Sequence, residues 1–171
     1  KHNLTLNHIG NVELIEQPAW CREEEVTFYL NSDSSGGNAL FDPANWEANV
    51  KSQAHPQPVK MQATTLDLLN VKHPRLIKID TEGAEQKILE GAQLLLRTYR
   101  PPYVVTEINP HGLAQSGCDE MTLRKFMGQF GYDAFALHAN GAIPSLIPHD
   151  TRIHPKGDLH ISNVLFSDIP N

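Results

Sequence analysis

The chain has 171 residues, of which 40% are hydrophobic, so it is long enough for one globular domain with its own core. Its formal net charge is -6 and its lysines and arginines form no cluster, which argues against nucleic acid or an anionic membrane as a partner. No run approaches the roughly 18 consecutive apolar residues of a membrane span. Cys21 and Cys118 form no CxxC pair, which favours the reducing cytoplasm.

The first part of the chain predicts short strands separated by turns. Apolar residues at 4–9 are typical of the end of a helix, and a turn signal follows them. β-Branched and aromatic residues then concentrate in three runs, and strands are therefore expected at 11–15, 26–30 and 59–63. Residues 65–69 fit a single helical turn.

Strands and helices alternate in the second part of the chain. Strands are expected at 76–80, 103–108, 132–137 and 160–166, and helices at 84–97 and 121–130. Asp119 is the expected N-cap of the second helix, and Gly131 its C-terminal stop. The connection before the last strand has about 22 residues, and its length predicts either a functional lid or a poorly ordered loop.

This alternation predicts the α/β fold class. A strand–helix–strand order indicates a parallel sheet with helices on both faces. No helical pattern separates the last two strands, so the final strand is expected to run antiparallel to its neighbours. The sequence therefore predicts a mostly parallel sheet with an antiparallel final strand.

Three carboxylates gather at the carboxyl end of the strand expected at 76–80, namely Asp80, Glu82 and Glu85. Ligands bind at the carboxyl ends of strands in open α/β sheets, and an apolar strand needs no acid at its tip to fold. Asp80 and Glu82 are therefore catalytic candidates, with Asp80 abstracting a proton or positioning an acceptor. The alternative is structural: Asp80 caps the following helix, while Glu82 and Glu85 stabilise its N-terminus. That alternative accounts best for Glu85.

Two further candidates follow the next strand. Glu107 ends that strand at the same edge of the sheet, and a carboxylate pair with Asp80 would leave one acid as a base near neutral pH. The alternative is a strand-end acid that binds backbone. His111 follows in the loop after Asn109 and is a candidate general base, against the alternative of a solvated histidine.

The run from Lys78 to Glu85 reads K-I-D-T-E-G-A-E, and the run from Ile88 to Ala92 reads I-L-E-G-A. Together they resemble the K-I-D-x-E-G-x-E turn and the v-L-x-G-A helix of the FkbM family of methyltransferases. The likeness extends over most of the chain, through Thr65-Leu66-Asp67, Val105-Thr106-Glu107 and Gly131-Tyr132.

The resemblance implies a class I, Rossmann-like methyltransferase fold with S-adenosylmethionine as the cofactor. It implies O-methylation of a hydroxyl on a sugar, a polyketide or a related small molecule, so the expected partner is a small-molecule or glycan acceptor. In that fold Asp80 lies between cofactor and acceptor. Glu16 and Gln17 follow the strand that contacts the adenine, so the implied cofactor-binding residues are Glu16, Gln17 and Asp80.

The start of the chain departs from the family pattern. The glycine-rich loop after the first strand and the acid after the second are both missing, and the run 34–38 opens no helix that would replace them. With the family strand order 3-2-1-4-5-7-6, the first two strands would lie between those at 11–15 and 76–80. We therefore expect a single, N-terminally truncated domain over 1–171 that is inactive alone. Either the strand at 11–15 shifts against 76–80, or two edges stay unpaired.

Two other functions remain open from the sequence. Asp80, Glu82, Glu107 and a histidine are a donor set for a metal-dependent hydrolase that uses a hard divalent ion. His149, His154 and His160 fit no compact zinc spacing, so no metal ligand is assigned. A non-catalytic remnant or interaction domain is the third possibility. Specificity for the acceptor is expected in 41–58 and 139–158, and the oligomeric state has no signature in the sequence.

Overall fold

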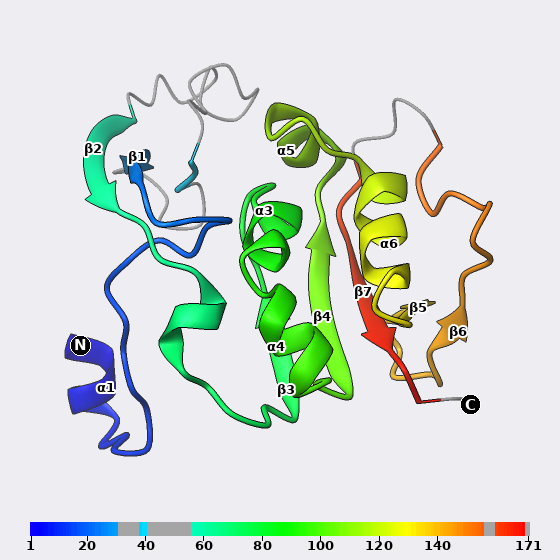
Figure 1. The fold of residues 1–171 in the computed structure, drawn as a ribbon, viewed down its shortest axis with the longest axis horizontal. Coiled ribbons are helices and arrows are strands. Elements are labelled where there is room, and N and C mark those ends of the chain that lie inside the picture. Colours follow the sequence, from blue (N-terminus) through cyan, green and yellow to red (C-terminus); the bar gives the residue numbers. More distant parts are fainter. Residues whose placement is uncertain (31–37, 41–55, 156–159, 170–171) are drawn as a thin grey trace.

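The computed structural model describes residues 1–30, 38–40, 56–155 and 160–169 (Figure 1). Its strands form two sheets that lie side by side. The smaller is an antiparallel pair of β1 (Glu25–Leu30) and β2 (Gln57–Gln62). The larger has five strands, in the spatial order β3 (Leu76–Ile79), β4 (Tyr103–Ile108), β7 (Ser162–Ser167), β5 (Asp133–Ala136) and β6 (Ser145–Leu146).

The larger sheet is mixed, so the expectation of a mostly parallel sheet is wrong for the described residues. Only β3 and β4 pair in parallel, whereas β4–β7, β7–β5 and β5–β6 are antiparallel. The reason is topological. β3, β4 and β5 run in the same direction, but β7 returns between β4 and β5 and so replaces one parallel pairing with two antiparallel ones. The antiparallel direction of the last strand is confirmed.

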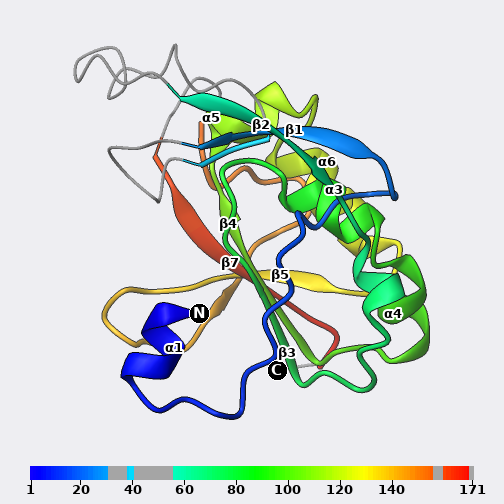
Figure 2. The ribbon, with the colours of Figure 1, turned by 90° about the vertical axis from the view of Figure 1, so that its left-hand side faces the viewer.

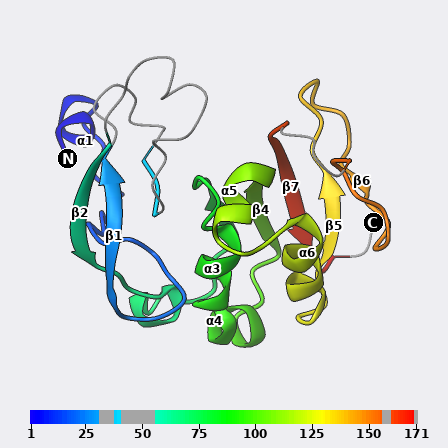
Figure 3. The same cartoon turned by 90° about the horizontal axis from the view of Figure 1, so that it is seen from above.

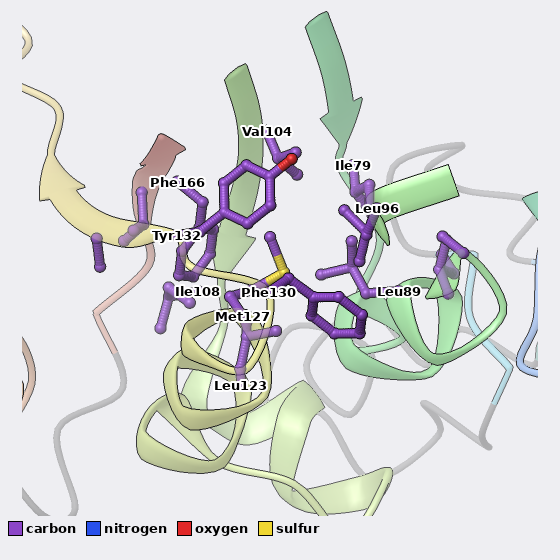
Figure 4. Close-up of a cluster of buried hydrophobic side chains, with 14 of the residues drawn as sticks. Ile79, Leu89, Leu96, Val104, Ile108, Leu123, Met127, Phe130, Tyr132 and Phe166 are labelled. Atoms are coloured by element: carbon purple, nitrogen blue, oxygen red, sulfur yellow. The ribbon is translucent and has the colours of Figure 1, made fainter. Parts of the chain in front are cut away.

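The helices α3 (Glu85–Glu90), α4 (Gln93–Thr98) and α6 (Glu120–Gly128) lie on the same side of the sheet (Figure 3). The side chains of β4 alternate between its two faces, as the pleat requires. The core lies between the helices and one face, where Leu89, Leu96, Leu123, Met127, Val104, Ile108 and Phe166 pack together (Figure 4). The opposite face of β4, with Tyr103, Val105 and Glu107, stays partly exposed. Helices on both faces, as the sequence predicts, are not found in the described residues.

The helix expected at 84–97 is interrupted, and this interruption has a tertiary cause. α3 ends at Glu90 with Gly91 as its C-cap, and α4 begins after its N-cap Ala92. The Gly91 carbonyl accepts a hydrogen bond from the Asp67 amide, while the Asp67 carboxylate accepts from the Leu94 and Leu95 amides at 3.0 and 2.9 Å. The short helix η3 (Leu66–Leu69), expected at 65–69, therefore supplies the cap that α4 lacks in its own sequence.

The strand expected at 11–15 is wrong. After α1 (His2–Leu6), the side chains of Val12, Leu14 and Ile15 are exposed and their backbone pairs with no strand. The chain meets a partner only further on, in an isolated parallel bridge between Ala19 and Thr64. Figure 2 shows α1 on the side of the molecule opposite α4. β3 pairs only with β4 among the described strands, so its other edge is unpaired.

Two connections contain structure that the sequence did not predict. A helix, α5 (Pro110–Gln115), follows β4 directly where a loop is expected, and β6 lies within the long connection before β7. No helix in the described ranges is long and apolar enough to cross a bilayer. Parts of three segments named from the sequence lie outside the described residues: 34–37 of the run 34–38, 41–55 of the specificity segment 41–58, and 156–158 of the specificity segment 139–158.

The close approach at Gly91 predicts an asymmetry between two glycines. A Cβ at Gly91 would come within 2.1 Å of the Trp20 carbonyl oxygen, whereas a Cβ at Gly128 in α6 meets nothing within 4 Å. We expect Gly91→Ala to lower the free energy of unfolding by about 1–3 kcal/mol. Gly128→Ala should raise it by up to about 1 kcal/mol, because alanine favours the helix. Urea unfolding followed by circular dichroism measures both, and equal effects would contradict the packing.

Candidate functional site

The carboxyl end of β3 opens onto a cavity of about 440 Å³. One wall is the turn between β3 and α3, with Asp80, Thr81 and Glu82. The remaining lining comes from the first residues of α3 and from the N-terminal part of the chain, namely Ala84, Ile88, Pro18, Ala19, Phe28, Asn38, Ala39 and Leu40. The cavity thus has an acidic wall and a largely apolar wall.

The acidic turn is fastened to α5 by backbone contact. Gly83 has a φ of +100°, and a Cβ there would lie 2.0 Å from the Gly112 carbonyl carbon. Asn109 is the N-cap of α5, since its Oδ1 accepts from the Gly112 amide at 3.0 Å. The amide group of the same side chain donates to Glu82 Oε2 at 2.9 Å. Asn109 therefore joins the turn after β3 to the helix after β4.

The acids of this edge interact electrostatically. Burial raises the pKa of Glu82, the hydrogen bond from Asn109 opposes this, and the charge of Asp80 adds to the rise. Burial is also the largest cause that raises the pKa of Glu107. The negative charges of Glu82 and then Asp80 raise it further, and the positive charge of Lys78 lowers it. Lys78 Nζ lies 2.8 Å from Asp80 Oδ2 in an exposed ion pair. The structure thus brings Asp80, Glu82 and Glu107 together, and Glu82 acts on Glu107 more strongly than Asp80 does.

Glu85 is buried, which the sequence did not predict. Its side chain is fully inaccessible although it is the first residue of α3. Burial raises the pKa of Glu85 to about 7. A stabiliser of the helix N-terminus, the role expected from the sequence, would keep its charge in water, so that interpretation is incomplete.

The other predicted site residues lie away from the described lining of this cavity. His111 belongs to α5 and not to a loop. Glu16 forms an exposed ion pair with Lys1, and the Gln17 side chain donates to the Gln62 carbonyl oxygen at 3.3 Å. Their neighbours Pro18 and Ala19 do line the cavity.

The described residues do not favour the metal-dependent hydrolase. Among them, no group of three or more His, Cys, Asp or Glu side chains can hold a metal ion. His149 Nε2 lies 3.3 Å from Asp133 Oδ1, and His154 Nε2 lies 2.9 Å from Ser162 Oγ, so both have structural partners.

A second cavity, of about 640 Å³, lies on the open face of the larger sheet. Asp80 lines it as well, so this carboxylate borders both cavities. The other lining residues come from β3, β4, β7 and the segment after β5, and they are Lys78, Val105, Leu137, His138, Ala139, Ile161, Ser162 and Asn163. The lining is more polar than that of the first cavity.

Part of the long connection before β7 is fixed by a buried ion pair that the sequence reading missed. Arg124 Nη1 lies 3.0 Å from Glu120 Oε1, and both side chains are about 5% exposed. Arg124 also donates to the carbonyl oxygens of Ile147, Pro148 and Thr151, and the Glu120 carboxylate accepts from the amides of Ile153 and His154. These contacts hold residues 147–154 against α6. The spacing of Glu120 and Arg124, four residues apart on a helix, is the sequence feature that could have indicated this ion pair.

A comparison with protein-family models shows to which family this chain is related. Residues 2–134 match the family model described as the Methyltransferase FkbM domain. The chain belongs to the FkbM methyltransferase family. The matched range contains the acidic turn, β4 and the N-terminal segment, so both walls of the first cavity are family structure. No curated protein and no solved structure matches this FkbM chain significantly.

The close contact at Gly83 predicts that an alanine there destabilises the fold more than an alanine at a glycine with positive φ and free space around it. Gly117 also has a positive φ, of +72°, but a Cβ there meets nothing within 4 Å. We expect Gly117→Ala to cost about 1–2 kcal/mol from backbone strain alone. Gly83→Ala should cost at least about 3 kcal/mol, because the clash with Gly112 adds to the strain. The free energy of unfolding in urea separates the two, and equal costs would argue against the contact.

The buried ion pair predicts a second contrast. Removing Arg124 leaves Glu120 buried without its cation, so Arg124→Ala should lower the free energy of unfolding by about 3–5 kcal/mol. Arg152 lies 2.8 Å from Asp119, but in an exposed pair. Arg152→Ala should therefore cost no more than about 1 kcal/mol. Chemical unfolding measures both variants, and a similar small cost for the two would refute the anchoring role.

Proposed function

We propose that this chain forms part of the active site of an S-adenosylmethionine-dependent methyltransferase that methylates a hydroxyl group of a small molecule or glycan. Family membership supports methyl transfer as the reaction class. The observation that carries the proposal is the position of Asp80, which borders both cavities at the carboxyl end of β3. A group at this boundary can act between a methyl donor on one side and an acceptor on the other.

The first cavity suits the methyl donor by its chemistry. Its size lies in the range of small-ligand pockets, roughly 300–1,000 Å³. Phe28, Ala39 and Leu40 offer apolar surface to an aromatic base, while Asp80 and Glu82 offer negative charge. S-Adenosylmethionine, when bound, supplies a methyl group activated by a positively charged sulfonium. The acidic wall stabilises positive charge, so the residues present fit the cofactor.

The second cavity suits the acceptor. His138 and Asn163 offer hydrogen-bonding groups, and Val105 offers an aliphatic surface, which together fit a molecule with hydroxyl groups. Asp80 can accept the proton that an acceptor hydroxyl loses during transfer. The two cavities contribute mainly by holding the methyl donor and the acceptor hydroxyl close together and correctly oriented. Proximity and orientation supply most of the rate gain in a methyl-transfer displacement. Glu107 adds negative charge at the same edge.

Cofactor binding tests this proposal. We expect the chain to bind S-adenosylmethionine through the lining of the first cavity. A ligand at its dissociation constant adds about 0.4 kcal/mol to the free energy of unfolding, and a ligand at ten times that value about 1.4 kcal/mol. We therefore expect S-adenosylmethionine to raise the melting temperature in a concentration-dependent way. Asp80→Asn should reduce this rise, because it removes a negative charge from the cavity wall.

The charge on the ligand provides the internal control. S-Adenosylhomocysteine lacks the sulfonium charge, so Asp80→Asn should weaken its binding less than that of S-adenosylmethionine. Asp150→Asn removes an exposed carboxylate from the long connection, outside the described lining of both cavities, and should change neither. No stabilisation by either ligand in the wild type, or equal losses for both ligands in Asp80→Asn, would contradict the proposal.

A further inference from the structure

The acidic turn is held by a side chain that faces away from solvent. Glu85 Oε1 accepts hydrogen bonds from Thr81 Oγ1 at 2.9 Å and from the Gly83 amide at 3.3 Å. Both donors belong to the turn that presents Asp80 and Glu82 to the first cavity. Glu85 itself is fully buried and does not line either cavity. Its two hydrogen bonds therefore stabilise the conformation of the turn, and the side chain is not in a position to contact a ligand in either cavity.

The turn has a second support that acts from the other side. Asn109 binds Glu82 Oε2, and the backbone of Gly83 packs against that of Gly112. These contacts fix Glu82 and Gly83 to α5 but leave the Thr81 hydroxyl to Glu85. The Glu85 carboxyl spans the turn, from the residue after Asp80 to the glycine before α3, and it acts beside a backbone hydrogen bond from the Gly83 amide to the Thr81 carbonyl oxygen at 2.8 Å.

We propose that Glu85 is a positioning residue, whose buried carboxyl holds Thr81 and Gly83 so that Asp80 and Glu82 stay on the cavity wall. This assignment rests on the proposed function only where it concerns the methyl donor. Its structural part, the fixed shape of the turn, stands on the hydrogen bonds and the burial of Glu85 alone.

The protonation of Glu85 agrees with this role. A fourth negative charge would be repelled at this edge, where Glu107 of β4 already disfavours ionisation of Glu85. Cys118, which follows α5, is the other titratable group coupled to Glu85, and it supplies no cation. With a pKa of about 7 against an ordinary value of 4.5, Glu85 binds a proton more tightly in the folded state. Its contribution to stability is full below about pH 4.5 and falls as the pH rises to about 7.

Three variants separate positioning from mere stability. Glu85→Gln keeps an oxygen acceptor for Thr81 and Gly83 and cannot ionise. Glu85→Ala removes the acceptor of the Thr81 hydroxyl and leaves the Gly83 amide to its hydrogen bond with the Thr81 carbonyl oxygen. Leu89→Ala removes a fully buried side chain from the same helix and removes no hydrogen bond of the turn, so it serves as the matched control for lost stability. The readouts are the backbone amide chemical shift of Gly83 by NMR and the dissociation constant for S-adenosylmethionine, at about pH 6 and about pH 8.

We expect Glu85→Gln to keep the Gly83 shift and the affinity, and to remove their change between the two pH values. Glu85→Ala should move the Gly83 shift and weaken S-adenosylmethionine binding by roughly tenfold. Leu89→Ala should lower the melting temperature yet keep both readouts. An unchanged Gly83 shift in folded Glu85→Ala, or an equal loss of affinity in Leu89→Ala, would overturn the positioning role. If the wild type binds no cofactor, the proposed function fails, while the Gly83 shift still decides whether Glu85 holds the turn.

Discussion

The backbone contact between Gly83 and Gly112 sets the geometry on which the acidic site depends. No side chain separates the two segments, so the end of β3 and the start of α5 lie at a fixed distance. Asn109 spans the same junction with both ends of its amide, which fixes the rotation of the turn as well as its distance. Since α5 directly follows β4, this junction also places Glu107 at the edge that carries Asp80.

The consequence of this geometry is a concentration of negative charge that the protein itself neutralises only in part. Burial and mutual repulsion raise the pKa of Glu82 and of Glu107, and Lys78 is the cation that opposes this at Glu107. Burial raises the pKa of Glu85 to about 7, so this carboxyl adds less negative charge near neutral pH than an ordinary glutamate would. A site of this kind favours a positively charged ligand. Under the proposed function this preference has a chemical meaning, because methyl donors of the sulfonium type carry such a charge.

The candidate site could be predicted in part, because two of its features follow from neighbouring parallel strands. Asp80 and Glu107 end β3 and β4, and parallel strands bring their carboxyl ends to one edge. The start of α5 could also have been predicted from the sequence, since Asn109 is a typical N-cap and Pro110 a typical first helical residue. The burial of Glu85 was not readable, because its place at the start of a helix is equally compatible with exposure. His111 was expected in a loop because the helix α5, which contains it, was not predicted.

The sequence by itself determined the order and kind of most elements: the strands from β1 to β7 apart from β6, the helix that begins after Asp119, and the membership of a family with a recognisable turn. These are local patterns, written within a few residues of the chain. Tertiary structure decided what depends on partners far away in sequence. The helix at 84–97 breaks where the Trp20 carbonyl oxygen and the Asp67 amide approach Gly91, and the apolar run at 11–15 forms no strand because the chain there does not lie along the edge of β3 that stays unpaired among the described strands.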